Sequence, residues 1–106
     1  MDAVTGKHKS ALQRAEQDLK PRDKIGIANV FWEFLIPATK AKIMERAGRI
    51  AGDSDTAITA MLLAYGDIHY PGAEPEDVAV EVGTRISMND LLVEDFLAEI
   101  EPAFHE

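Results

Sequence analysis

One apolar stretch constrains the fold more than any other feature of the chain. Residues 57–65 are apolar except for Thr59. The short polar side chains of residues 53–55 predict a helix N-cap just before it, because they accept hydrogen bonds from the free amides of a first turn. Residues 66–67, Gly-Asp, predict the end of this helix, which then spans about 55–66. A helix that is apolar on all sides has no face for solvent, so we predict that it lies in the middle of a bundle.

Three segments before this stretch have apolar residues at helical spacing. We predict helices over 8–20, over 22–36 and from Thr39 to about Gly52, with Thr39 as a cap and Gly52 as a stop. Proline lies between them because it cannot continue a helix: Pro21 ends the first or starts the second, and Pro37 closes the second. Their apolar positions are Ala11, Leu12, Ala15 and Leu19, then Ile27, Val30, Phe31, Phe34 and Leu35, then Ile43, Met44, Ala47, Ile50 and Ala51.

The segment 75–86 admits two interpretations. Its opening Pro75-Glu76-Asp77 is typical of a helix first turn, where acids interact favourably with the helix dipole. Its β-branched residues alternate from position 78 to 86, as in a half-buried strand. We favour a short helix near 75–82, since the chain offers no second strand. The strand alternative requires pairing with an unrecognised hairpin or with another chain.

A last helix is predicted over 88–101. Residues 87–90, Ser-Met-Asn-Asp, resemble a capping box, and Pro102 follows the helix. One side of this helix is apolar and contains Met88, Leu91, Leu92, Val93, Phe96, Leu97 and Ile100. The other side is acidic and holds Asp90, Glu94, Asp95, Glu99 and Glu101. We therefore predict an all-α fold, a single domain over 1–106 with five or six helices and at most one short extended segment near 78–86.

Charge is segregated along the chain. Residues 1–50 contain ten Lys and Arg against six Asp and Glu, a net charge of +4, whereas residues 51–106 contain one against thirteen, a net charge of −12, which sum to the −8 of the chain. Segregation of this kind is typical of a surface that meets an opposite charge. The sequence pI of about 4.8 argues against direct binding of nucleic acid, which requires clustered cations.

Several chemistries find no support in the sequence. The absence of cysteine excludes disulfides and thiolate-bound metals. No apolar leader segment and no membrane-spanning run is present, so a cytoplasmic protein is expected. Asp67, His69 and His105 lack the spacing of metal ligands, and no serine lies in a nucleophile motif. We predict no catalytic residues, no cofactor and no metal.

The segment 30–36 is the strongest candidate for partner binding. Only Glu33 is polar in it, so either the helix is central or part of its apolar surface is exposed. We predict a protein–protein interaction module, not an enzyme, in which the acidic last helix steers a basic or apolar partner protein. A homodimer is one way of covering the excess apolar surface. The predicted partner-binding residues are Phe31, Trp32, Leu35, Tyr65, Tyr70, Asp90, Glu94, Asp95 and Glu99.

Parts of the chain resemble the small tail assembly chaperones of long-tailed phages. The similar stretches are Val-Thr-Gly-Lys at 4–7, Ala-Met-Leu-Leu-Ala-Tyr at 60–65 with a Pro-Gly turn after it, and Ile-Ser-Met-Asn-Asp-Leu-Leu-Val-Glu-Asp-Phe at 86–96. They cover about a quarter of the chain, and residues 20–50 show no such similarity. The resemblance implies a short helical protein that binds unassembled tail or tape-measure subunits.

Three alternatives remain open. The acidic charge also suits an inhibitor that mimics nucleic acid and blocks a nuclease or a DNA-binding protein. Asp53-Ser54 before an apolar helix is similar to the phosphopantetheine attachment site of acyl or peptidyl carrier proteins, although Asp55 replaces the leucine of that family. An enzyme becomes the better interpretation if Asp67 and His69 face a common pocket with acids of the last helix.

Overall fold

The computed structural model describes residues 10–104, which fold into six α-helices and one 3₁₀-helix without a strand. The all-α prediction is confirmed. The predicted first turn at residues 8–9, the stretch 4–7 and His105 lie outside the described residues. The helices are α2 (Ala11–Gln17), α3 (Pro21–Trp32), α4 (Pro37–Ala47), α5 (Ser54–His69), α6 (Pro75–Ser87), α7 (Val93–Ile100) and η1 (Glu101–Phe104).

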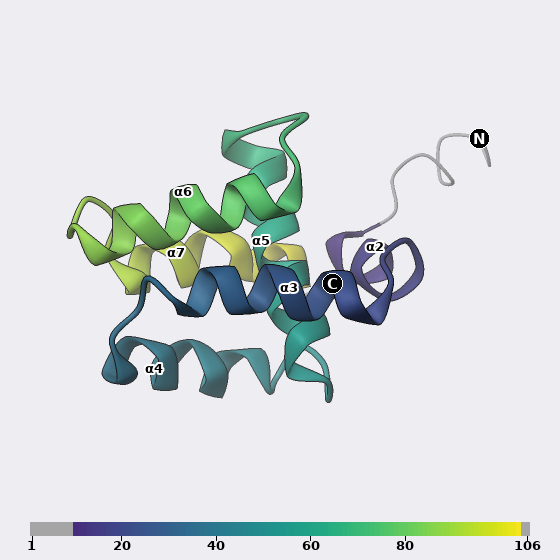
Figure 1. Cartoon of the computed structure of the whole chain (residues 1–106), viewed down its shortest axis with the longest axis horizontal. Helices are drawn as coiled ribbons and strands as arrows, with labels where there is room; N and C mark the ends of the chain where they lie inside the picture. Colours follow the sequence, from purple (N-terminus) through teal and green to yellow (C-terminus); the bar gives the residue numbers. More distant parts are fainter. Residues whose placement is uncertain (1–9, 105–106) are drawn as a thin grey trace.

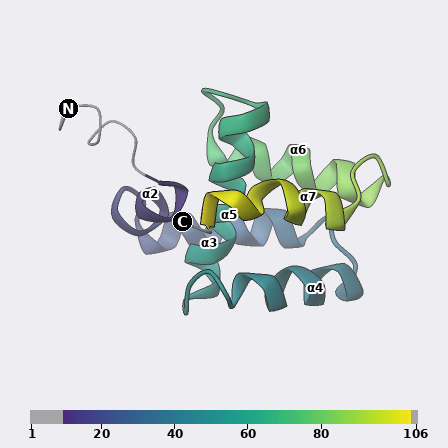
Figure 2. The ribbon, with the colours of Figure 1, turned by 180° about the vertical axis from the view of Figure 1, so that it is seen from behind.

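Helix α5 forms the centre of the molecule. It runs across the other helices, which pack around it (Figures 1 and 2), and it contacts α2, α3, α4, α6 and α7. Ten of its sixteen residues are buried, which confirms the central position predicted from the apolar stretch. The predicted cap is also correct, because Asp53 Oδ2 accepts a hydrogen bond from the Thr56 amide.

The end of α5 was predicted wrongly. Gly66 does not stop the helix, which continues to His69. Gly66 is buried, and a Cβ placed there would lie 3.0 Å from Val78 Cγ2 on α6. This glycine therefore allows close approach of α5 and α6 rather than ending α5.

Prolines open helices in this chain. Pro21, Pro37 and Pro75 each occupy the first turn of a helix. Amides of the first turn have no acceptor within the helix, so the N–H that proline lacks costs no hydrogen bond there. The prediction that Pro37 closes a helix and that Thr39 caps the next is therefore wrong. The stop at Gly52 is also wrong, because α4 ends at Ala47 with Gly48 as its C-cap.

The segment 75–87 is one continuous helix, so the helix interpretation is correct but too short, and the strand interpretation is wrong. Val78, Val82 and Ile86 are buried, and their spacing of four places them on one helix face. The alternating β-branched pattern contains this series, which explains why the sequence fits both structures.

The chain turns where the last helix was expected to begin. Helix α6 extends to Ser87, whose hydroxyl donates to the Thr84 carbonyl at 2.9 Å instead of capping a new helix. Asn89 has φ of 61°, a left-handed conformation that asparagine tolerates better than most residues. Helix α7 begins only at Val93, so the capping box and the start at residue 88 are wrong.

An aromatic cluster joins α3, α5 and α7. The ring of Phe96 lies 6.1 Å from that of Phe31 and 5.2 Å from that of Tyr65, measured between centroids. All three side chains are buried, and Phe96 is fully so. This cluster fixes the last helix against the centre of the fold.

Candidate interaction surface

Two of the predicted partner-binding residues belong to the core. Phe31 is 1% exposed and Tyr65 is 2% exposed, so neither presents a surface to a partner. Burial also raises the pKa of the Tyr65 hydroxyl above its ordinary value. We therefore drop both residues from the candidate surface. Trp32, Leu35 and Tyr70 are half-buried.

The three most exposed of the large apolar residues lie at one end of the bundle, whereas Ile25, Met44, Ile68 and Val80 are exposed elsewhere. We call this region the loop end and define it as residues 33–36, between α3 and α4, together with residues 88–92, between α6 and α7. Both connections lie at the same end in opposite views (Figures 1 and 2). Ile36 is 66% exposed, Met88 is 64% exposed and Leu92 is 57% exposed.

A hollow of about 210 Å³ lies between the two connections. Its lining is contributed by both of them and by the adjoining helix turns: Phe34, Leu35, Ile36, Thr39, Ile86, Ser87 and Asn89. Phe34 rests against the backbone of α6 at Gly83, where an added Cβ would lie 2.8 Å from Phe34 Cδ2. The absence of a side chain at Gly83 thus lets the α3–α4 connection settle onto α6.

Acidic side chains surround the loop end. Glu33 and Asp90 lie within it, and Glu94 and Asp95 follow in the first turn of α7, all of them exposed. Lys42 Nζ donates to Glu94 Oε2 at 2.7 Å, and this hydrogen bond holds the pKa of the Glu94 carboxyl below its ordinary value. Lys40 Nζ of α4 lies over the Trp32 ring, 5.2 Å from its centroid. The surroundings of the exposed apolar side chains are therefore predominantly acidic.

The charge segregation of the sequence is partly satisfied inside the molecule. Arg14 of α2 pairs with Asp67 of α5, and Lys42 of α4 pairs with Glu94 of α7. Lys24, which is buried, donates to Thr56 Oγ1 at 2.9 Å at the start of α5. Ion pairs between the basic first half and the acidic second half therefore connect α2 to α5 and α4 to α7. The charge pattern predicted a surface for a partner, and part of it serves the chain's own folding.

Two predicted residues lie elsewhere. The Tyr70 hydroxyl accepts a hydrogen bond from Arg85 Nη1 at 3.1 Å, which raises the pKa of that guanidinium. Glu99 Oε2 lies 2.5 Å from His69 Nε2, near the end of α5. The structure therefore places Leu35 and Asp90 in the loop end, with Trp32, Glu94 and Asp95 next to it along the chain. Tyr70 contacts Arg85 of α6 and Glu99 contacts His69 of α5.

The residues named for other functions do not converge. Asp67 faces Arg14 of α2, whereas His69 faces Glu99 of α7, so the two do not share one site. Within residues 10–104 no group of three or more His, Cys, Asp or Glu could hold a metal ion. Ser54 is the first residue of α5 and is half-buried. None of the described helices is long and apolar enough to cross a membrane.

The predicted partner-binding residues include none of the three most exposed apolar residues of the loop end, although Ile36 lies in the candidate segment 30–36. Met88 and Leu92 were counted on the apolar face of a helix that begins only at Val93. Ile36 was counted at the end of a helix that stops at Trp32. The turn-forming pair Asn89-Asp90 was the available signal, since such pairs favour turns over helix interiors.

No family model, no curated protein and no solved structure matches the chain. Its function must therefore be argued from its own residues.

Proposed function

We propose that this protein is an interaction module whose loop end binds a protein segment carrying both apolar and basic side chains. The observation that carries this proposal is the exposure of Ile36, Met88 and Leu92 at one end of a domain whose centre is well packed. Clustered exposed apolar side chains are typical of interaction sites, because burying them against a partner removes apolar surface from water.

The acidic surroundings define the chemistry of the partner. Carboxylates around an apolar patch attract a basic segment, set its register and discourage acidic competitors. Asp90 and Asp95 are exposed and form no ion pair within the described part of the chain, so they remain available to a partner's Lys or Arg. The apolar contacts supply affinity and the carboxylates supply orientation.

An assembly role is the finer form of this proposal. The stretch 86–96, which resembles the phage tail assembly chaperones, runs through the α6–α7 connection and into α7. The loop end would then hold an unassembled structural subunit before its incorporation. This role needs no catalytic group.

The proposal is tested by affinity capture from native lysate with washes at low and then high salt. The double variant Ile36→Asp/Met88→Asp places two negative charges on the loop end, and Ile68→Asp places one negative charge at an apolar residue of α5 that is 53% exposed. We expect one structural or assembly subunit to stay bound to the wild type and to Ile68→Asp at high salt, and to be lost from the double variant. Equal retention by all three proteins would refute the proposal.

Self-association is tested with the same variants. If the partner is a second copy of the chain, light scattering gives a dimer mass for the wild type and for Ile68→Asp. The double variant then gives a monomer mass. A concentration-independent monomer mass for the wild type rules out the homodimer.

A second candidate function is suggested by α6. Its exposed carboxylates and the one just before it carry no ion pair to a described residue: Glu74, Glu76, Asp77 and Glu81. A row of acids suits an inhibitor that mimics the phosphates of nucleic acid. Salt distinguishes the candidates, because a partner held by charges alone is released at high ionic strength. Release of a nuclease or DNA-binding protein by salt, without any effect of the loop-end variants, would favour the mimic.

A further inference from the structure

The hollow of the loop end has an apolar floor. Ile86 of α6 is buried, and Phe34 and Leu35 of the α3–α4 connection are half-buried. Their side chains carry no polar atom, so a group that enters the hollow between them leaves water for an apolar environment. The floor therefore favours an apolar side chain.

The size of the hollow indicates which apolar side chain it accepts. Its volume is about 210 Å³, whereas an apolar cavity of about 150 Å³ takes up benzene. One aromatic ring therefore fits. Phe34 offers a ring of its own to the occupant, and a pair of aromatic rings is stabilised beyond the area that it buries. The hollow thus favours an aromatic ring over an aliphatic side chain.

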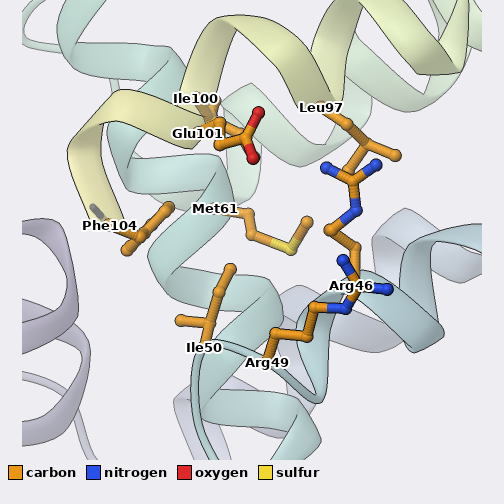
Figure 3. Close-up of a pocket in the computed structure, with 8 residues that line it drawn as sticks. All are labelled: Arg46, Arg49, Ile50, Met61, Leu97, Ile100, Glu101 and Phe104. Atoms are coloured by element: carbon orange, nitrogen blue, oxygen red, sulfur yellow. The ribbon is translucent and has the colours of Figure 1, made fainter.

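A smaller hollow, between α4, α5 and the C-terminal elements α7 and η1, does not meet this requirement (Figure 3). Its volume is about 100 Å³, less than that of a cavity that takes up benzene. Figure 3 shows the Glu101 carboxyl group next to the Arg46 guanidinium, with Met61 below both. These opposite charges offset each other, so this hollow selects neither a ring nor a sign of charge.

Polar groups at the hollow of the loop end are suited to the main chain of a bound segment. Ser87 and Asn89 are exposed, and Thr39 is half-buried. The Ser87 hydroxyl donates to the Thr84 carbonyl and keeps its capacity to accept. The side chains of Thr39 and Asn89 form no hydrogen bond with another residue of the described range 10–104. These groups can bond the amides and carbonyls of a peptide whose ring lies in the hollow.

The charges near the hollow select the neighbours of that ring. Glu33, Asp90 and Asp95 are exposed, and none of them forms an ion pair with another residue of the part of the chain that the structure describes. Glu94 does not belong to this set because it pairs with Lys42. Three unpaired carboxylates near an apolar hollow attract Lys or Arg side chains.

We propose that the hollow of the loop end is a pocket for one phenylalanine-type ring of a protein segment that carries Lys or Arg on both sides of the ring. This inference rests on the proposed interaction function of the loop end and names the side chain that anchors the partner. The ring supplies the buried contact at the centre of the interface, and the flanking cations set its register.

The peptide acetyl-Lys-Lys-Phe-Lys-Lys-amide, which we call the Phe peptide, is the probe for this pocket. We expect saturable NMR shifts of the Ile86 methyl groups at physiological ionic strength, and no shift of the Met61 methyl group in the smaller hollow. No saturable shift at Ile86, or an equal shift at Met61, would overturn the proposal.

Three altered peptides separate the ring from the charges. Alanine in place of the phenylalanine should weaken binding at least about tenfold, because the buried apolar contact is lost. Leucine should weaken it at least about twofold, because no ring meets Phe34. Glutamate in place of every lysine should abolish the saturable shift. Binding of any of these peptides as tight as that of the Phe peptide would contradict the assignment.

Two matched aspartate variants test the carboxylates. Asp90→Asn should weaken binding of the Phe peptide about two- to fivefold, as for an exposed ion pair. Asp77→Asn removes the same charge from the first turn of α6, at the other end of that helix, and should leave the Kd unchanged. Equal effects of the two variants would show that Asp90 does not pair with the segment.

A further pair of variants tests the hollow itself. Thr39→Phe places a ring in the lining of the hollow, and should weaken binding of the Phe peptide at least about tenfold. Ala41→Phe adds the same ring at an exposed position of α4 outside the lining, and should change the Kd less than about twofold. Urea unfolding verifies that both variants fold. Equal binding by both would overturn the proposal.

Failure of this pocket is distinguishable from failure of the proposed function. If the captured partner is lost from Ile36→Asp/Met88→Asp but retained by Thr39→Phe, the loop end binds its partner without a ring in the hollow, and only this inference is wrong. If the double variant retains the partner, the proposed function is wrong, and the inference that rests on it falls as well.

Discussion

Helix α5 and the loop end are both rich in apolar side chains, and they differ in what covers them. Ile58, Met61 and Leu62 of α5 are buried because five helices contact α5 from different sides. Ile36 and Met88 lie in connections at one end of the bundle, beyond the helices that cover α5. Apolar content therefore does not distinguish core from interaction surface in this chain. The topology decides which apolar side chains are covered by other helices.

The largest expected effect comes from comparing a residue of each region. Phe96→Ala removes a fully buried ring from the aromatic cluster and should lower the free energy of unfolding by about 3–5 kcal/mol. Leu92→Ala removes an apolar side chain from the loop end and should change the free energy of unfolding by less than about 0.5 kcal/mol. Urea denaturation of both variants measures the difference. A large loss for Leu92→Ala would mean that this residue is packed and that the loop end is not free.

The next effect is at the contact between the loop end and α6. Gly83→Ala would bring a Cβ within 3.0 Å of Phe34 Cβ as well as against its ring, so the α3–α4 connection must shift. We expect a loss of about 1–3 kcal/mol in unfolding free energy, as for other overpacked positions. Gly26→Ala in α3 meets no atom within 4 Å and should instead stabilise the protein by about 0.5–1 kcal/mol.

Thermal or urea unfolding distinguishes these two glycine variants. The Gly83→Ala variant should also lose partner binding, because the position of Phe34 shapes the hollow of the loop end. Equal stabilisation by both substitutions would show that Phe34 does not rest on Gly83 in solution.

A smaller effect concerns the cap of α5. Asp53 accepts hydrogen bonds from the amide and the hydroxyl of Thr56, which hold the pKa of its carboxyl below the ordinary value of 3.8. Asp53→Ala should cost about 1 kcal/mol at neutral pH. Because the folded-state pKa is the lower one, this contribution is complete above about pH 4 and is lost as pH falls through the folded-state pKa.

Unfolding of the wild type and of Asp53→Ala as a function of pH checks this prediction. Asp53→Asn is the control, because asparagine caps helices without titrating. A constant difference between the wild type and Asp53→Ala, down to the lowest pH at which both remain folded, would contradict the assignment.

The smallest effect is electrostatic and confined to the edge of the loop end. Lys42→Gln removes the donor to Glu94 and should return the pKa of the Glu94 carboxyl toward its ordinary value. Carbon-detected NMR titration of the side-chain carboxyls measures this shift. An unchanged pKa would show that the two side chains do not pair in solution.

The sequence predicts the central helix and the fold class well, because the stretch 57–65 leaves few alternatives. It predicts the ends of the helices poorly. Pro37 was expected to end a helix and starts one, and Gly66 was expected to end a helix and lies inside one. In both cases the local residue type is compatible with two roles, and tertiary packing selects one.

The candidate surface was predicted only in part, because here too tertiary packing decides between roles that the local residue types allow. The segment 30–36 was recognised as more apolar than one helix face needs, yet the buried Phe31 and the exposed Ile36 look equivalent in sequence. The α6–α7 connection was taken as helix, so Met88 and Leu92 were assigned to the core side. Which apolar residues remain uncovered depends on where α3 and α6 end, and periodicity does not determine this.

The most direct test of the loop end is site-specific photo-crosslinking in native lysate. A benzoylphenylalanine at position 88 reports contacts of the loop end, and the same group at position 68 reports an equally apolar, exposed position on α5. We expect a defined protein adduct from position 88 that Ile36→Asp suppresses, and no such adduct from position 68. Adducts of equal yield from both positions, or none from position 88, would contradict the assignment of the loop end as the interaction surface.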